Sequence, residues 1–184
     1  MELVSIIMPA YNCSRFIREA IDSVLAQTYT AWELLIVDDC STDDTAAIIA
    51  SYQDERIHYF RNEQNSGAAL SRNKALREAK GKYIAFLDAD DSWMPEKIEK
   101  QVAFMEQNGY AFTYTAFHRT DKPLRISGPR HITKMGMYAF CWPACPTVMY
   151  NREKIGLIQI TDLRKNNDYS MWLHVIRKAD CYLL

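Results

Sequence analysis

The feature that most constrains the fold is an alternation, in the first half of the chain, between short apolar runs and segments whose apolar residues recur at helical spacing. Short apolar runs are typical of buried strands, and strands that alternate with helices pair in parallel through right-handed crossovers. The runs are LVSIIM (3–8), WELLIVDD (32–39), IHYFRN (57–62) and KYIAFL (82–87), and the helical segments lie near residues 16–25, 45–52 and 65–81. The sequence therefore predicts an α/β fold with a mainly parallel central sheet flanked by helices.

The second half of the chain continues this alternation less regularly. Its expected elements are a helix from about Pro95 to Asn108, an alternating strand over 110–119, a loop with one short strand and one helical turn over 120–145, a strand at PTVMYN (146–151), a helix at DYSMWLHVIRKA (168–179) and a strand at CYLL (181–184). With 184 residues, of which 48% are hydrophobic, the chain is long enough to bury one core. We therefore expect a single domain over residues 1–184.

The charge balance argues against nucleic acid as a partner, because 22 lysines and arginines face 23 aspartates and glutamates. No apolar run approaches the roughly 20 residues of a membrane span. The first residues, MELVSIIMPAYN, lack the basic start and the cleavage site of a signal peptide. The sequence therefore favours a cytoplasmic protein that binds no nucleic acid.

The cysteines, at positions 13, 40, 141, 145 and 181, are odd in number and widely scattered, which argues against a disulfide framework. A zinc site built from Cys141, Cys145 and His131 is disfavoured, because their spacing is not one of the paired patterns of structural zinc sites. We therefore interpret the cysteines as free thiols.

Acidic residues gather at the ends of two predicted strands. Asp38 and Asp39 follow the second strand, and Asp88, Asp90 and Asp91 follow the fourth. Ligands of parallel α/β sheets bind beyond the carboxyl ends of the strands, so these carboxylates are expected to share a cleft with the loop after the first strand. By itself, the second acidic cluster also fits a solvated turn that caps the next helix. Like charges in a cleft without a lysine run favour a divalent cation over that turn.

A divalent cation in such a cleft implies a phosphate-bearing ligand. Mg²⁺ and Mn²⁺ bind proteins through one or two carboxylates and complete their shells with water and substrate phosphates, so a nucleoside diphosphate is the expected partner. The chain lacks both G-x-x-x-x-G-K-[ST] and G-x-G-x-x-G, which disfavours a P-loop NTPase and a dinucleotide enzyme. The phosphates must then be met by metal and arginine.

Several segments together carry a resemblance to a known family. In chain order they read SIIMPAYN, SVLAQTY, ELLIVDDCSTDDT, NSGAALSRNKAL, GKYIAFLDADD and NNDYSMWL. The set resembles the family 2 inverting glycosyltransferases, which use nucleotide sugars and include bacterial enzymes of cell-surface polysaccharide synthesis. The resemblance implies the Rossmann-like GT-A fold, with a nucleotide-sugar-binding half over 1–110 and an acceptor-side half over 111–184 that is expected to continue past Leu184.

The resemblance also implies a role for each matching residue. Asp88 and Asp90 match the D-x-D element, with Asp88 towards the ribose, Asp90 binding the Mn²⁺ or Mg²⁺ that bridges the phosphates, and Asp91 in support. Asp168 matches the catalytic base that deprotonates the acceptor. The alternative for Asp168 is the N-cap of its own helix. The residues expected to hold the nucleoside or the diphosphate are Pro9, Ala10, Tyr11, Asp39 and Arg72.

Three positions depart from the residues that are common in the family. Asn167 stands where the base usually has an acidic neighbour, and Ser170 stands where an aspartate is common. These two changes bear on the acceptor and on the pKa of the base. Cys40 replaces a frequent glycine, which bears on the turn after the second strand.

The function that the resemblance implies is the inverting transfer of a sugar from a nucleotide diphosphate sugar, with uridine diphosphate (UDP) as the expected nucleotide, to a hydroxyl. The expected acceptor is a growing surface glycan or its lipid carrier, so the chain would act at the inner face of the membrane. Three alternatives stay open. A sugar nucleotidyltransferase typically has a glycine-rich N-terminal loop, a retaining glycosidase needs no nucleotide site, and a nucleotide-sugar-binding module needs no base.

Overall fold

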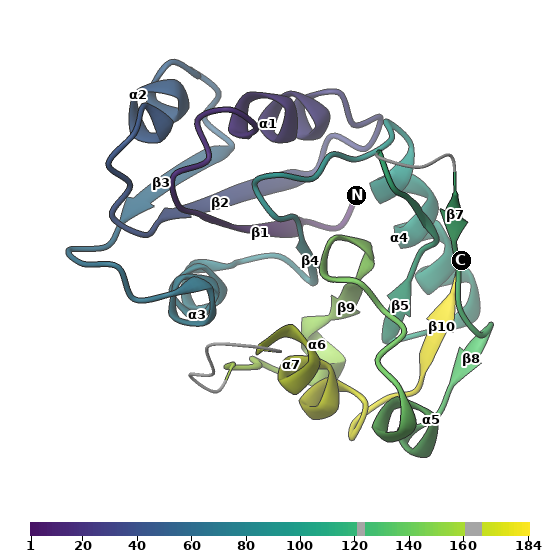
Figure 1. The fold of residues 1–184 in the computed structure, drawn as a ribbon. Helices are drawn as coiled ribbons and strands as arrows, with labels where there is room; N and C mark the ends of the chain where they lie inside the picture. The colour runs from purple at the N-terminus through teal and green to yellow at the C-terminus, as the bar shows by residue number, and fades with distance from the viewer. Residues whose placement is uncertain (121–123, 161–166) are drawn as a thin grey trace.

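The fold is built on an eight-stranded sheet, shown in Figure 1. The computed structural model describes residues 1–120, 124–160 and 167–184. In sheet order the strands are β3 (Ile57–Arg61), β2 (Trp32–Asp38), β1 (Val4–Ala10), β4 (Tyr83–Phe86), β9 (Met149–Asn151), β5 (Phe112–Tyr114), β10 (Cys181–Leu183) and β8 (His131–Ile132). A separate ribbon consists of β6 (Phe117–His118) and β7 (Arg125–Ile126).

Most neighbouring strands of the large sheet run parallel. β1 is parallel to β2 and β4, β2 is parallel to β3, and β5 is parallel to β10. β9 runs antiparallel to both of its neighbours, β4 and β5, and β8 runs antiparallel to β10. The predicted α/β fold with a mainly parallel sheet is therefore confirmed, and the carboxyl ends of β1, β2 and β4 lie along one edge.

Helices cover both faces of the sheet (Figure 1). In β1, Ile6 and Met8 lie in the core formed with α1, α2 and α4, whereas Ile7 lies in the core on the opposite face with α3, α5, α6 and α7. Among the described residues, no helix combines the length and apolar composition that a membrane crossing requires. The helices are α1 (Ile17–Leu25), α2 (Thr45–Ala50), α3 (Ala68–Glu78), α4 (Lys97–Asn108), α5 (Lys134–Ala139), α6 (Arg152–Ile155) and α7 (Asn167–Val175), with a 3-10 turn, η1, at Cys145–Thr147.

The core between α7 and the sheet is aromatic. Trp172 of α7 is fully buried, and its ring meets Phe86 of β4 edge-on at a centroid distance of 5.2 Å. The ring of Phe112 in β5 lies 6.0 Å away from the same tryptophan. Truncation of a buried tryptophan typically costs about 3–5 kcal/mol. These contacts hold α7, which begins with Asn167 and Asp168, against the strand that leads into the acidic turn.

The second half of the chain contains more elements than the sequence predicted. The strand expected over 110–119 is two strands, because the chain leaves the sheet after β5 and the next residues pair with β7 instead of with a sheet neighbour. The stretch 120–145, expected to contain one short strand and one helical turn, contains β7, β8 and α5. Two-residue strands have too few positions to show a periodic pattern, so the sequence could not indicate them.

Candidate active site

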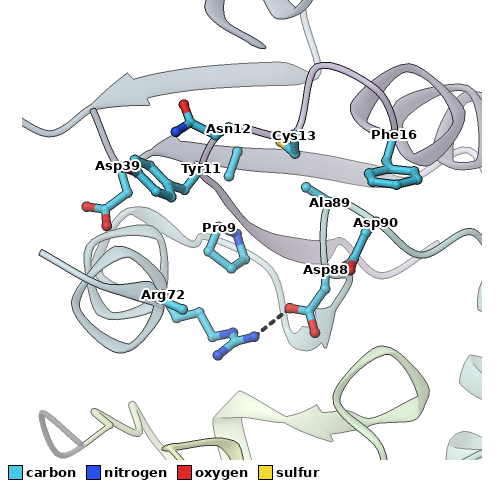
Figure 2. Close-up of a pocket in the computed structure, with 12 residues that line it drawn as sticks. Pro9, Tyr11, Asn12, Cys13, Phe16, Asp39, Arg72, Asp88, Ala89 and Asp90 are labelled. Carbon is cyan, nitrogen blue, oxygen red and sulfur yellow. Dashed lines mark hydrogen bonds and ion pairs between the residues drawn. The ribbon is translucent and has the colours of Figure 1, made fainter. Parts of the chain in front are cut away.

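A cavity of about 340 Å³ opens at the edge of the sheet where β1, β2 and β4 end (Figure 2). The residues around it lie at the end of β1, in the segments that follow β1, β2 and β4, and in or just before α3. Those predicted to contact nucleotide or metal are Pro9, Ala10, Tyr11, Asp39, Arg72, Asp88 and Asp90, and the others are Asn12, Cys13, Phe16, Ala68 and Ala89. The parallel topology has therefore gathered the predicted donor-side residues into one cavity.

Several hydrogen bonds connect the loop after β1 to the loop after β2, including some at Asn12. The backbone N–H of Asn12 donates to Ser41 Oγ at 3.0 Å, and the N–H of Thr42 donates to Asn12 Oδ1 at 2.8 Å. Asn12 and Cys40 have φ values of 47° and 65°, in the left-handed region that glycine adopts most readily. The backbone at Cys40 thus accounts for the glycine that is frequent there in the family. The two loops form one connected wall of the cavity.

Asp38, the last residue of β2, is a structural residue. Its side chain is fully buried, and Ala10 is its partner in the register of β1 and β2. One carboxylate oxygen accepts the N–H of Ser41 at 2.8 Å, and the other accepts the hydroxyl of Tyr59 at 2.8 Å. Asp38 therefore holds the loop that carries Asp39 and does not line the cavity.

Asp39 lines the cavity, but the loop before α3 occupies much of its carboxylate. Oδ1 accepts hydrogen bonds from Asn62 Nδ2 at 2.7 Å and from the N–H of Ser66 at 2.9 Å, and Oδ2 accepts the N–H of Gly67 at 2.7 Å. Burial acts to raise the pKa of Asp39, but these hydrogen bonds outweigh it and leave the pKa below its usual value. The charged carboxylate therefore fastens this loop to the end of β2.

Replacing Asp39 with alanine is expected to weaken both the fold and nucleotide binding. The N–H groups of Ser66 and Gly67 lose their acceptor, and an unsatisfied donor that stays buried costs about 1–3 kcal/mol. Because the folded-state pKa is lowered, this stabilisation is present above the unfolded pKa of about 3.9 and is lost as the pH falls through the folded pKa. Urea unfolding should therefore separate variant from parent at neutral pH and less so in acid. If Asp39→Ala binds UDP as tightly as the parent, the nucleoside does not contact Asp39 and must bind in another part of the cavity.

The buried guanidinium of Arg72 connects the acidic turn after β4 to the start of α7. Its Nη2 donates to Asp88 Oδ1 at 2.5 Å, the ion pair drawn in Figure 2, and its Nη1 donates to Asn167 Oδ1 at 2.7 Å. Burial acts to lower the pKa of Arg72, whereas the neighbouring Cys145 and Asp88 raise it above its usual value. Asn167, which replaces an acidic residue of the family, is therefore a partner of a permanently charged side chain.

The turn after β4 presents its carboxylates in different ways. The N–H of Asp91 donates to the carbonyl of Asp88 at 3.0 Å, Asp88 is half-buried against Arg72, and Asp90 and Asp91 are exposed at the rim. Crowding by protein atoms and the negative charges of Asp88 and Asp90 raise the pKa of Asp91 to about 6. In the described part of the chain, no three His, Cys, Asp or Glu side chains gather into a metal cage. The turn would instead suit a divalent cation whose coordination shell is completed by phosphate oxygens of a ligand.

Asp168 lies apart from these residues, at the start of α7 and in the wall of a second cavity. Its Oδ1 accepts the N–H of Tyr169 at 2.8 Å, and among the described residues no other group hydrogen-bonds to the carboxylate. Asp168 is the second residue of α7, and position 166, which precedes the helix, lies outside the described residues. Oδ1 thus supports the first helical turn, but Asp168 lies inside the helix and accepts the N–H of the next residue, so it is not the N-cap that the alternative expected. Oδ2 has no hydrogen-bond partner among the described residues.

The partners of Asp39 and the lining residue Phe16 were not predicted from the sequence. Asn12 belongs to the loop after the first strand, which was expected to share the cleft, and asparagine is enriched at left-handed positions in loops. The triplet Asn65–Gly67, just before a helix, is typical of a loop whose N–H groups need acceptors. Nothing in the sequence marked Phe16 as a cavity residue, because the helical pattern of α1 already accounts for an apolar residue at that position.

The residues of the disfavoured zinc site have other neighbours. His131 Nε2 lies 2.8 Å from Asp180 Oδ2, and the imidazole ring stacks on Tyr182 at a centroid distance of 4.7 Å. Cys145 is buried, and Cys141 is partly buried near Asp168. The structure therefore gives His131 partners other than the two thiols.

Comparison with protein families and curated proteins identifies related chains. A family model described as glycosyl transferase family 2 matches residues 5–168. TuaG of Bacillus subtilis, named as a glycosyltransferase of teichuronic acid biosynthesis, is 43% identical over 184 residues, which cover 96% of this chain and 73% of TuaG. The Escherichia coli UDP-Glc:alpha-D-GlcNAc-diphosphoundecaprenol beta-1,3-glucosyltransferase WfaP is 43% identical over 183 residues, which cover 97% of this chain and 72% of WfaP.

Solved structures share the fold. TarS of S. aureus, residues 1–349, matches all of this chain with a TM-score of 0.85 and 24% identity, and this chain covers 58% of it. The same TarS segment in complex with UDP-GlcNAc gives a TM-score of 0.84. The mannosyltransferase PcManGT from Pyrobaculum calidifontis, in complex with GDP-Man and Mn²⁺, gives 0.77 at 18% identity, with 98% of this chain and 54% of that one covered. With the family model matched over residues 5–168 and two relatives at 43% identity, this chain belongs to glycosyl transferase family 2.

Proposed function

We propose that this chain transfers a sugar, with inversion, from a UDP-sugar to a hydroxyl of a cell-surface glycan or of its lipid-linked precursor. The observation that carries the proposal is the bridge made by Arg72. One guanidinium nitrogen holds Asp88 in the nucleotide cavity, and another holds Asn167, the neighbour of Asp168. Such a bridge would connect the donor site to the helix that carries the base, as direct displacement requires. The names of the two curated relatives support the reaction class.

The donor would occupy the cavity at the ends of β1, β2 and β4. Pro9, Ala10 and Tyr11 would pack against the nucleoside, with Asp39 near the base and Asp88 towards the ribose. Arg72 would face the diphosphate with its permanent charge. Every lining residue of this cavity lies between positions 9 and 90, which supports residues 1–110 as the donor half. The UDP-GlcNAc complex of TarS, a structure with the same fold, supports UDP as the nucleotide.

Asp90, supported by Asp91, would hold Mn²⁺ or Mg²⁺ beside the diphosphate. The donor set fits such an ion, because the Asp90 carboxylate is exposed and lines the cavity, while phosphate oxygens would complete the shell. A bound divalent ion would neutralise the charge that develops on the leaving diphosphate. The Mn²⁺ complex of PcManGT supports a divalent ion at this fold.

Asp168 would act as the general base through Oδ2. The proton of the attacking hydroxyl passes to this carboxylate, the acceptor oxygen forms a bond to the anomeric carbon, and the bond from that carbon to the phosphate oxygen breaks, so that UDP leaves. A single displacement from the face opposite the leaving group inverts the configuration. Arg72 acts as a positioning residue, because its hydrogen bond to Asn167 fixes the first turn of α7 and the direction of the neighbouring carboxylate.

The acceptor side would be formed by residues 111–184, which include the second cavity. WfaP is named for a diphosphoundecaprenol-linked acceptor, which supports a lipid-linked glycan as the acceptor class. Such a substrate would bring the chain to the inner face of the cytoplasmic membrane as a peripheral protein. Sugar nucleotidyl transfer and a purely binding role are less well supported, because both curated relatives are named as glycosyltransferases.

UDP is expected to bind in a manner that depends on a divalent ion. Without a cation, Asp88 and Asp90 repel the diphosphate, so removal of Mn²⁺ by a chelator should lower the affinity at least about tenfold, or roughly 1.4 kcal/mol. Calorimetric titration gives the affinity, and release of UDP from a panel of UDP-sugars in the presence of acceptors gives the activity. Equal affinity with and without metal contradicts the metal site. Binding without transfer to any acceptor would favour the binding module.

A further inference from the structure

The second cavity lies between α7 and the segment that follows α5. Its volume is about 570 Å³, which is within the range of sites that hold small ligands. Asp168 lies in its wall, and aromatic rings form much of the rest. We call this cavity the aromatic groove, after its lining residues Phe117, Phe140, Trp142 and Tyr169.

Two of these rings are exposed to solvent although they are large and apolar. Phe140 is 57% exposed and Trp142 is 42% exposed. Their ring centroids lie 4.6 Å apart and their planes meet at 53°, so the pair forms a corner instead of a flat stack. Exposed apolar groups that adjoin one another indicate a binding surface, whereas isolated ones need no explanation.

The walls of the aromatic groove are held by contacts outside it. The hydroxyl of Tyr169 donates to the carbonyl of Met137 at 2.9 Å, which ties α7 to α5. Trp142 packs closely on Gly128, where an added Cβ would lie 3.2 Å from the indole ring and 2.5 Å from the hydroxyl of Tyr114. A ligand that meets rings fixed in this way loses less free energy to ordering of the site.

The lining of the aromatic groove carries little charge. Asp168 is its carboxylate, and no lysine or arginine belongs to the lining in the described part of the chain. Burial and the nearby Asp168 raise the pKa of the Cys141 thiol to about 12, so this lining group stays neutral. An anion such as a lipid diphosphate would meet this negative charge without a lysine or arginine among the described lining residues. A neutral ligand with hydroxyl groups has no such cost.

The aromatic groove adjoins the acidic turn through Phe117. This residue also lines a third cavity, whose wall includes Asp90 and Asp91. A ligand in the groove would therefore have the proposed base beside it and the proposed metal-binding turn at the next cavity along the surface.

We propose that the aromatic groove binds an uncharged sugar ring of the acceptor and so sets which glycan is extended. One face of the ring, with its C–H groups, would lie against Trp142 and Phe140, and the reacting hydroxyl would point at Asp168. The diphosphate and lipid of a lipid-linked acceptor would then extend out of the groove. This inference rests on the proposed glycosyl transfer, which gives Asp168 its role as a base.

The kinetic test is Trp142→Ala in the chain as it stands. The acceptor KM is expected to rise about tenfold, whereas the donor KM and the kcat at saturating acceptor should change little, because the ring touches neither nucleotide nor reacting atoms. Trp142→Phe keeps an aromatic face and should restore most of the acceptor affinity. Met94→Ala is the control, since this side chain is 77% exposed and precedes α4 away from the aromatic groove. An unchanged acceptor KM overturns the proposal.

Binding can also be measured without turnover. With UDP and Mn²⁺ present, neutral methyl glycosides of glucose, galactose and N-acetylglucosamine should change the tryptophan fluorescence of the parent. At least one should do so, and Trp142→Phe should abolish the change, because the other tryptophans, Trp32, Trp93 and Trp172, are buried. The corresponding glycosyl phosphates should bind no more tightly than the glycosides.

Three results would overturn this proposal. One is the absence of a response to every glycoside in protein that still binds UDP, and another is tighter binding of the glycosyl phosphates. The third is a Trp142→Ala variant that binds phospholipid vesicles less well at an unchanged acceptor KM, which would make the aromatic groove a membrane contact. If the parent protein does not bind UDP at all, the proposed function itself is contradicted. Failure of the proposed function can therefore be distinguished from failure of the proposed acceptor site.

Discussion

Replacing Asp168 with asparagine is expected to lower the rate of sugar transfer about 10²- to 10⁴-fold, the usual cost of losing a general base, while the affinity for UDP stays unchanged. Asparagine keeps an oxygen that accepts the N–H of Tyr169, so the start of α7 should stay folded. The amide is not basic enough to take the proton of the acceptor hydroxyl. Donor binding should be retained because Asp168 lines the aromatic groove and not the nucleotide cavity.

The measurement compares kcat with UDP affinity in the same preparation. Asp180→Asn is the matched control, because this carboxylate also lies in the second half of the chain and contacts His131 but lines neither the proposed nucleotide cavity nor the aromatic groove. If Asp168→Asn transfers sugar at the parent rate, Asp168 is not the base and only supports the first turn of α7. The base would then be sought at His174 in the same helix or at Asp162, which lies outside the described residues.

The meeting of the proposed donor-side residues in one cavity could be predicted because parallel strands bring their carboxyl ends to one edge. Continuous apolar runs identified β1, β2 and β4, and their alternation with helices indicated that they run parallel, although it did not indicate their order in the sheet. Pro9 lies near the end of β1, and Asp39 and Asp88 follow β2 and β4, so their meeting in one cavity depends on topology alone. Strand recognition and the ligand rule for open α/β sheets are sufficient for this part of the site.

The direction of individual side chains could not be predicted in the same way. Asp38 and Asp39 are adjacent and chemically alike, yet Asp38 is buried against Tyr59 and Asp39 lines the cavity. The hydrogen bond from Arg72 to Asn167 joins residues of α3 and α7, and no shared period links these helices. Such contacts depend on tertiary packing, which a single sequence does not encode in local pattern.

The second half of the chain, which we propose as the acceptor side, was the least predictable part of the fold. Its strands are two or three residues long, and β9 enters the sheet antiparallel, so neither periodicity nor the crossover rule applies there. The rings of the aromatic groove come from three separate segments, near Phe117, Phe140 and Tyr169. In sequence, these aromatics are as consistent with a core as with a surface. Their exposure is what distinguishes the two.

Replacing Asp90 with asparagine is expected to remove the metal dependence of donor binding and, with it, most of the transfer. Asparagine keeps the size and one oxygen of the ligand but loses the charge that attracts a hard cation. Changes in residues that merely support metal ligands cost about 10- to 100-fold in metal affinity, so loss of the charged ligand should cost at least about 100-fold. Titration of Mn²⁺ in the presence of UDP, followed by calorimetry, measures this loss directly.

The Asp90 and Asp168 variants should fail differently, and the difference separates the donor site from the base. Asp90→Asn should lose Mn²⁺ and UDP affinity together, whereas Asp168→Asn should retain both and lose only turnover. Glu96→Gln is the control for a surface charge near the acidic turn, since Glu96 is exposed and pairs with Lys100. If Asp90→Asn binds Mn²⁺ as tightly as the parent, Asp91 becomes the stronger candidate ligand, because Asp88 Oδ1 is already engaged by Arg72.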